Sequence, residues 1–118
     1  MQEIQKNSYQ NLIVWQKSMD LVEMLYKTTG NFPKSELFGL VSQMRRAAVS
    51  IPSNIAEGSR RLKTEKMHFL RIAFGSGSEL ETQLGIALRL DFISKEESAK
   101  LISLLEEILK MLNKMIQY

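Results

Sequence analysis

Apolar residues recur every three or four positions along four segments of the chain, and this spacing is what most restricts the fold. It places apolar side chains on one face of an α-helix, whereas a half-buried β-strand alternates at every second residue. The pattern predicts helices over residues 13–29, 36–58, 64–90 and 95–117. Because short connections favour antiparallel neighbours, we expect residues 1–118 to form a single all-α domain, an antiparallel up-down-up-down four-helix bundle.

The first helix should end at Gly30, with the glycine in the left-handed conformation and Pro33 blocking continuation. Its expected inner face is Trp15, Met19, Val22, Leu25 and Tyr26. Ser35 is the expected N-cap of the second helix.

The second helical pattern continues through Pro52 and should end at Gly58. Its expected inner face is Leu37, Leu40, Val41, Met44, Ala48, Ile51 and Ile55. Proline removes a backbone hydrogen bond at a cost of about 3 kcal/mol. We therefore expect either a helix kinked near Pro52 or a short new helix that begins there.

Thr64 is a plausible N-cap for the third helix, and Ser94 with Glu97 forms a capping box at the start of the fourth. The core-facing residues expected on the third helix are Met67, Leu70, Phe74, Gly77, Leu84 and Leu88. Three glycines interrupt the third helix, namely Gly75, Gly77 and Gly85. Glycine weakens a helix, so we expect close approach of another backbone there. The fourth helix carries an apolar stripe of Leu101, Leu104, Leu105, Ile108, Met111, Leu112 and Met115.

The helices carry more apolar surface than one bundle is expected to bury. Beside the main stripes lie Phe38, Val49 and Ala56 on the second helix and Ile102, Leu109 and Ile116 on the fourth. A monomer would expose these side chains, so we expect the chain to form a homo-oligomer.

Composition excludes several classes of site. The chain contains no cysteine, which excludes disulfides and thiolate chemistry, and neither a signal peptide nor a membrane span is evident, so we expect a cytoplasmic protein. Glu65 and the only histidine, His68, match half of a di-iron motif, but no second histidine completes it. The Gly75–Ser78 run lacks the strand and lysine of a phosphate loop. We therefore expect no enzyme activity, no metal and no cofactor.

Positive charge is concentrated in the first part of the chain. Residues 1–71 hold eleven Lys and Arg against six Asp and Glu, and residues 72–118 hold five against seven. The candidate nucleic-acid-binding residues are Arg45, Arg46, Arg60, Arg61, Lys63, Lys66 and Arg71. Several cations on one surface could bind phosphates, although surface Lys and Arg also serve only for solvation.

A polar stripe on the second helix is the other candidate site. Together with two residues of the third helix it comprises Gln43, Arg46, Ser50, Asn54, Glu57, Glu79 and Gln83. The stripe could be a solvated helix face, or it could form a polar interface network at a subunit contact or pore. Arg46 and Glu79 would be the ion pair of such a network.

Several motifs together resemble one known family. They are Phe32-Pro33 with Glu36, Ser42-Gln43 with Arg45-Arg46-Ala47, the run from Ser50 to Gly58, and Gly75-Ser76 leading to Glu79-Leu80 and Leu84. Nearly the whole chain resembles the four-helix-bundle family that includes proteins encoded in 23S ribosomal RNA intervening sequences. The resemblance implies a bacterial homopentamer with no known catalysis. It also extends to the accessory protein of diversity-generating retroelements, a basic pentameric bundle that associates with reverse transcriptase and nucleic acid.

Two functions follow as expectations. The first is a non-enzymatic homo-oligomer that binds structured RNA through the basic cluster. The alternative is a protein-binding adaptor, for example for a reverse-transcriptase-type partner, in which the polar stripe and the exposed apolar line make the contacts.

Overall fold

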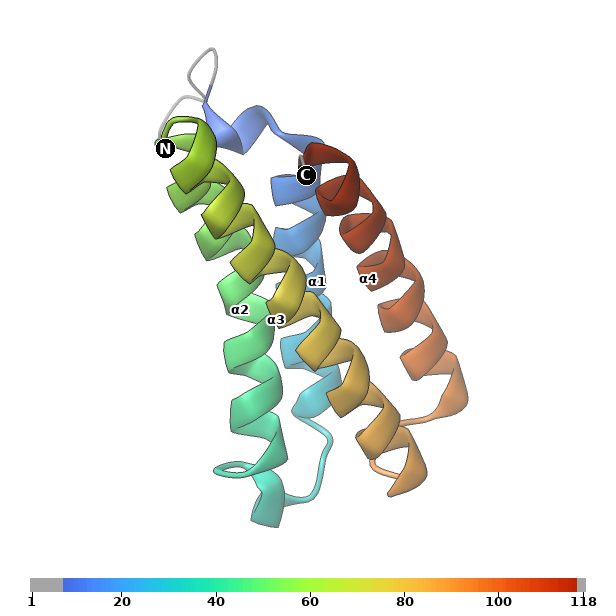
Figure 1. Ribbon diagram of the computed structural model, residues 1–118. Helices are drawn as coiled ribbons and strands as arrows, with labels where there is room; N and C mark the ends of the chain where they lie inside the picture. Colours follow the sequence, from blue (N-terminus) through green and yellow to red (C-terminus); the bar gives the residue numbers. More distant parts are fainter. Residues whose placement is uncertain (1–7, 117–118) are drawn as a thin grey trace, which may run out of the picture.

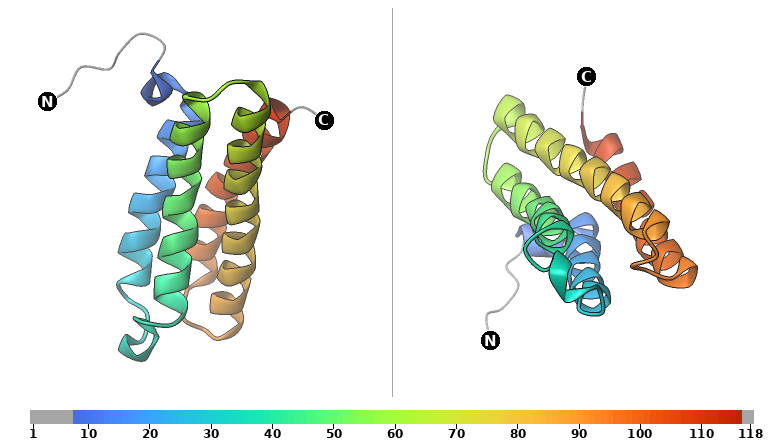
Figure 2. Two further views of the ribbon diagram at one scale, coloured as in Figure 1. Left: turned by 60° about the vertical axis from the view of Figure 1, so that its left-hand side comes forward. Right: turned by 90° about the horizontal axis from the view of Figure 1, so that it is seen from below.

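The computed structural model describes residues 8–116, which form four α-helices and two short 3₁₀ helices. The α-helices are α1 (Ile13–Thr29), α2 (Leu40–Ser59), α3 (Lys63–Arg89) and α4 (Lys95–Met115), and the 3₁₀ helices are η1 (Tyr9–Asn11) and η2 (Lys34–Glu36). Consecutive helices run in opposite directions (Figure 1). Each helix contacts the next along the chain, and α1 also contacts α4, so the four enclose one core (Figure 2). The expected all-α four-helix bundle is confirmed.

The core draws apolar side chains from all four helices. Its fully buried large residues are Leu21, Leu25, Met44, Ile51, Ile55, Leu70, Leu80, Leu84, Leu101, Leu105, Ile108 and Leu112. Between residues 8 and 116, no helix is both long and apolar enough to cross a membrane.

The buried face of α1 differs from the predicted one. Met19 and Tyr26 are exposed, and Trp15 and Val22 are only partly buried. The buried residues are Val14, Ser18, Leu21, Leu25, Thr28 and Thr29. Two adjacent stripes of α1 have helical spacing, and Ser18 can occupy the inner one because its hydroxyl donates to the Val14 carbonyl at 2.7 Å.

Gly30 ends α1 as predicted, but in the right-handed region, with φ −60° and ψ −20°. The predicted left-handed cap is therefore wrong. The chain instead leaves α1 through tight turns, in which Asn31 N donates to Thr28 O at 3.2 Å and Phe32 N to Thr29 O at 3.1 Å.

The second helix begins later than predicted, at Leu40, and Ser35 is not its N-cap. Ser35 lies in η2, which ends at Glu36. The carboxylate of Glu36 accepts a hydrogen bond from Leu40 N at 3.2 Å. A negative group suits this end of a helix, where backbone N–H groups have no partner within the helix. Leu37, expected on the inner face, lies before the helix and is exposed.

Helix α2 is continuous from Leu40 to Ser59, with Pro52 buried inside it. The alternative of a new helix beginning near Pro52 is therefore wrong, while the kink stays a prediction. Gly58 does not end the helix but is buried within it. A Cβ on Gly58 would lie 3.1 Å from Phe69 Cβ and 3.2 Å from Lys66 O, so glycine here lets α3 approach α2 closely.

Helix α3 begins at Lys63, one residue before the predicted Thr64 cap, and its N-cap is Leu62. Of its glycines, only Gly77 faces a neighbour, and that neighbour is a side chain rather than a backbone. A Cβ on Gly77 would lie 2.6 Å from Leu109 Cδ2, whereas Cβ atoms on Gly75 and Gly85 would meet no atom within 4 Å.

Ser94 is the N-cap of α4 as predicted, but the Glu97 carboxylate meets the Ser94 hydroxyl rather than the Ser94 backbone N–H of a full capping box. Ser94 Oγ accepts a hydrogen bond from Glu97 N at 3.1 Å and lies 3.1 Å from Glu97 Oε1. The helix ends at Met115. Its predicted end at residue 117 lies outside the described residues.

The second apolar line of the second predicted helix is exposed at Phe38, just before α2, and at Val49, but Ala56 is partly buried; the line of the fourth helix is not exposed. Phe38 is 93% exposed and Val49 is 39% exposed, whereas Ile116 is buried. Ile102 and Leu109 are partly buried and pack against the core. The expectation for the fourth helix is therefore wrong, because α1 and α3 flank α4 and cover more of its surface than periodicity suggests.

Candidate nucleic-acid interface

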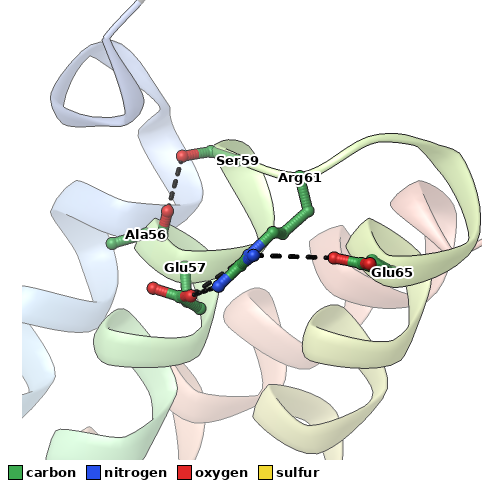
Figure 3. A network of polar contacts seen from close by, with 5 residues as sticks. All are labelled: Ala56, Glu57, Ser59, Arg61 and Glu65. Atoms are coloured by element: carbon green, nitrogen blue, oxygen red, sulfur yellow. Dashed lines mark hydrogen bonds and ion pairs between the residues drawn. The ribbon is translucent and has the colours of Figure 1, made fainter.

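The connector between α2 and α3 carries two of the seven predicted cations, and three more lie in the first nine residues of α3. It consists of residues 60–62, and the turn is closed by hydrogen bonds from Arg60 N to Glu57 O at 3.2 Å and from Arg61 N to Gly58 O at 3.0 Å. Ser59 Oγ donates to Ala56 O at 2.7 Å (Figure 3). We use the name basic connector surface for Arg60, Arg61, Lys63, Lys66 and Arg71.

Arg61 is bound by two carboxylates, one from each helix that the connector joins. Its guanidinium bonds the Glu57 carboxylate through Nη2 and, at 3.2 Å, through Nε, and Nη1 lies 3.7 Å from Glu65 Oε2 (Figure 3). The hydrogen bond and the charge of Glu57 raise the pKa of Arg61. Because Glu57 and Glu65 both face Arg61, its charge is largely compensated, and its role is to fix the connector.

The other cations lie around Arg61. The Arg60 guanidinium lies over the Tyr9 ring of η1, 5.5 Å from its centroid. A shallow hollow of about 670 Å³ is lined by Arg61, Leu62, Lys63, Thr64, Lys66, Met67 and Arg71. A second, of about 560 Å³, is lined by Arg60, Arg61, Leu62, Lys63, Thr64 and Glu65. The connector therefore presents two adjoining hollows lined mainly by basic and polar side chains.

Arg45 and Arg46 lie elsewhere. Arg60, the C-cap of α2, follows Arg46 by fourteen positions, which corresponds to about 21 Å at the rise of an α-helix. Arg45 Nε donates to Thr29 Oγ1 at 3.0 Å, and its guanidinium stacks on Tyr26 at 4.4 Å. The seven cations are thus two groups rather than one surface, and Arg45 is bound to the end of α1.

Within one chain, several residues of the predicted polar stripe are hydrogen-bonded to neighbours, while a network between subunits stays a prediction. Ser50 and Ser76 link α2 to α3 through their hydroxyls at 2.8 Å, and Asn54 Nδ2 donates to Ser50 O at 2.8 Å. Ser76 was not among the predicted residues, since only the pairing of α2 with α3 places it opposite Ser50. Glu57 does not join this network but forms an ion pair with Arg61.

Within the described chain, Arg46 forms no ion pair with Glu79. Glu79 Oε1 instead accepts a hydrogen bond from Gln83 Nε2 at 3.1 Å. Gln83 is 5% exposed, and its buried Oε1 has no hydrogen-bond partner. Gln43 and Arg46 are exposed on α2.

Neither the Glu65 and His68 pair nor the Gly75–Ser78 run is arranged as a metal or phosphate site within residues 8–116. His68 is exposed and lies edge-on to Phe69 at 5.4 Å. Throughout residues 8–116, no three His, Cys, Asp or Glu side chains are grouped so that they could hold a metal ion. The Gly75–Ser78 run is in the middle of α3, so its amides are committed to the helix rather than to a loop.

Comparison with known proteins identifies a family and solved structures with the same fold. The family model described as 23S rRNA-intervening sequence protein matches residues 10–114. A crystal structure of a protein of the S23 ribosomal protein family from Bacteroides thetaiotaomicron, of unknown function, matches with a TM-score of 0.82 and 23% identity. That match covers 90% of this chain and 96% of the other, and it shows a shared fold. No curated protein matches the chain.

Proposed function

The chain belongs to the 23S rRNA-intervening sequence protein family, and from this premise we propose that it is a non-enzymatic, cytoplasmic homo-oligomer that binds structured RNA through the basic connector surface. The observation that supports the proposal is the grouping of five cations in the α2–α3 connector and the first nine residues of α3, around two shallow hollows. The family description refers to ribosomal RNA and names no enzyme.

The electrostatics of the connector favour a polyanion. Phosphate groups are bound by several cations on one surface, and the release of their counterions makes the affinity depend steeply on salt. Arg61 is paired with Glu57 and Glu65, so we assign the phosphate contacts mainly to Arg60, Lys63 and Lys66.

Self-association is the second part of the proposal, and an exposed apolar patch supports it. A hollow of about 460 Å³ is lined by Tyr26, Leu37, Phe38, Ser42, Arg45, Arg46 and Val49. Phe38 is 93% exposed beside it. An aromatic side chain in such a position is typical of a protein contact. In a ring of copies, five as the family resemblance implies, each connector would add its charge to a common basic field.

Titration of a structured RNA at increasing salt tests the RNA-binding proposal. We expect the double variant Arg60→Gln, Lys66→Gln to bind more weakly and to lower the slope of log affinity against log salt by about 1.5, since each lost phosphate contact removes roughly 0.7–0.9. The matched control is Lys95→Gln, Lys100→Gln, which removes two exposed cations from the start of α4, at the other end of the bundle. Equal affinity and slope for wild type and both variants would refute the proposal.

A protein adaptor is the second candidate function, and the Phe38 patch favours it if a different protein rather than another copy covers that patch. Capture of partners before and after nuclease treatment separates the two functions. An RNA-binding protein loses its co-purifying material on digestion, whereas an adaptor keeps a stoichiometric protein partner whose binding is lost in Phe38→Ser.

A further inference from the structure

Leu62, in the connector between α2 and α3, is unusual in two respects: its apolar side chain is exposed, and it occupies a helix N-cap position. It is 87% exposed, more than any other large apolar residue described except Phe38. It is also the N-cap of α3, a position with no side-chain cap hydrogen bond here. Ser, Thr, Asp or Asn would serve that position better, because their side chains accept a hydrogen bond from the first turn. The fold therefore gains neither burial nor a cap from this leucine, which suggests a contact outside the chain.

The backbone holds Leu62 in place. Its carbonyl accepts hydrogen bonds from Glu65 N at 3.1 Å and Lys66 N at 3.4 Å. Before it, Arg61 is clamped to both helices by Glu57 and Glu65 (Figure 3). After it, Lys63 has φ +33°, a conformation that side chains other than glycine rarely adopt. The apolar side chain is thus displayed on a fixed turn, and little ordering entropy has to be lost when it binds.

The surroundings of Leu62 indicate the chemistry of its partner. Leu62 lines both hollows of the connector, which also share Arg61, Lys63 and Thr64. It is therefore an apolar side chain between two surfaces that attract anions. A nucleic-acid strand offers a complementary arrangement, in which a base lies between two phosphates. Proteins are known to insert leucine between bases while cations bind the adjoining backbone. A second copy of this surface would be repelled by like charge.

We propose that Leu62 is an apolar wedge that contacts an unstacked base of a bound RNA loop or bulge, while the adjoining phosphates lie in the two hollows. The inference rests on the proposed RNA-binding function and adds selectivity to it. Cations alone bind any phosphate backbone, but a wedge favours RNA whose bases are already unpaired, because less stacking is lost.

The test uses two RNA hairpins that differ only in a single bulged 2-aminopurine, with the full chain as wild type, Leu62→Ala and Leu90→Ala. Leu90 is the matched control, since it is 55% exposed and follows the other end of α3. We expect Leu62→Ala to weaken binding of the bulged hairpin about tenfold and to leave the fully paired hairpin and the salt slope unchanged. It should also remove the rise in 2-aminopurine fluorescence that unstacking produces, and Leu90→Ala should change none of these.

The outcomes distinguish the proposed role of Leu62 from the proposed RNA-binding function on which it rests. If Leu62→Ala binds both hairpins as wild type does, while Arg60→Gln, Lys66→Gln weakens both, the wedge is refuted and RNA binding stands. If no variant changes RNA affinity, the function itself is wrong. A change in oligomer mass, or in binding to anionic phosphatidylserine vesicles, caused by Leu62→Ala with RNA affinity unaltered would assign Leu62 to another partner and overturn the inference.

Discussion

At the scale of single residues, glycines in this bundle serve different purposes that their sequence context does not reveal. Gly58 lies against the backbone of α3, with Lys66 O only 3.2 Å from the position of an added Cβ. Gly75 points away from the bundle, and no atom lies within 4 Å of that position. The same substitution should therefore have opposite effects at the two sites.

We predict that Gly58→Ala lowers the free energy of unfolding by about 1–2 kcal/mol, because the strain of overpacking exceeds the gain in helix propensity. Gly75→Ala should raise it by about 0.5–1 kcal/mol, since the helix gains propensity without a clash. Urea unfolding followed by circular dichroism measures both. A Gly58→Ala protein as stable as Gly75→Ala would show that α2 and α3 can separate without cost.

At the scale of elements, helix starts depend on which polar group reaches the free N–H groups. Ser94 meets this need within its own segment. The start of α2 is different, because the chain forms η2 and a further turn first, and only then does Glu36 reach Leu40 N. A carboxylate four residues before the first helical residue replaces the expected serine.

We predict that Glu36→Ala destabilises the protein by about 1 kcal/mol through loss of this hydrogen bond and of a negative charge at the helix start. Ser35→Ala is the matched control, with an expected change of under about 0.5 kcal/mol, since Ser35 is exposed. Thermal unfolding of the two variants checks the difference. Were Ser35 the true cap, their order would be reversed.

At the scale of the whole molecule, the two ends of the bundle present different surfaces. The α2–α3 connector is basic and holds Leu62, whereas Leu37 and Phe38 are exposed at the opposite end, before α2 (Figure 1). Under the proposal, one end binds RNA and the patch near the other joins copies. The two functions should therefore be separable by mutation.

We predict that Phe38→Ser lowers the mass measured by light scattering and leaves the helix content unchanged, because a side chain that is 93% exposed contributes little to its own chain. Ile13→Ser, at an exposed position on α1, is the control and should keep the oligomer. Monomeric wild-type protein at high concentration would refute self-association.

The sequence alone was sufficient for the number and type of helices and for the Ser94 cap of α4, because each depends on residues a few positions apart along one helix. Two features could not be predicted in this way: the right-handed conformation of Gly30, and which of the two apolar stripes of α1 is buried. Neither could the separation of Arg45 and Arg46 from the basic connector surface.

Tertiary structure decided the packing of the helices and the positions of the polar side chains between them, because these depend on neighbours from another helix. Gly58 faces α3, Arg45 bonds the end of α1, and Ser50 pairs with Ser76 twenty-six residues away. Helical periodicity reports which residues share a face, but only packing determines which face is buried and which atoms meet across it.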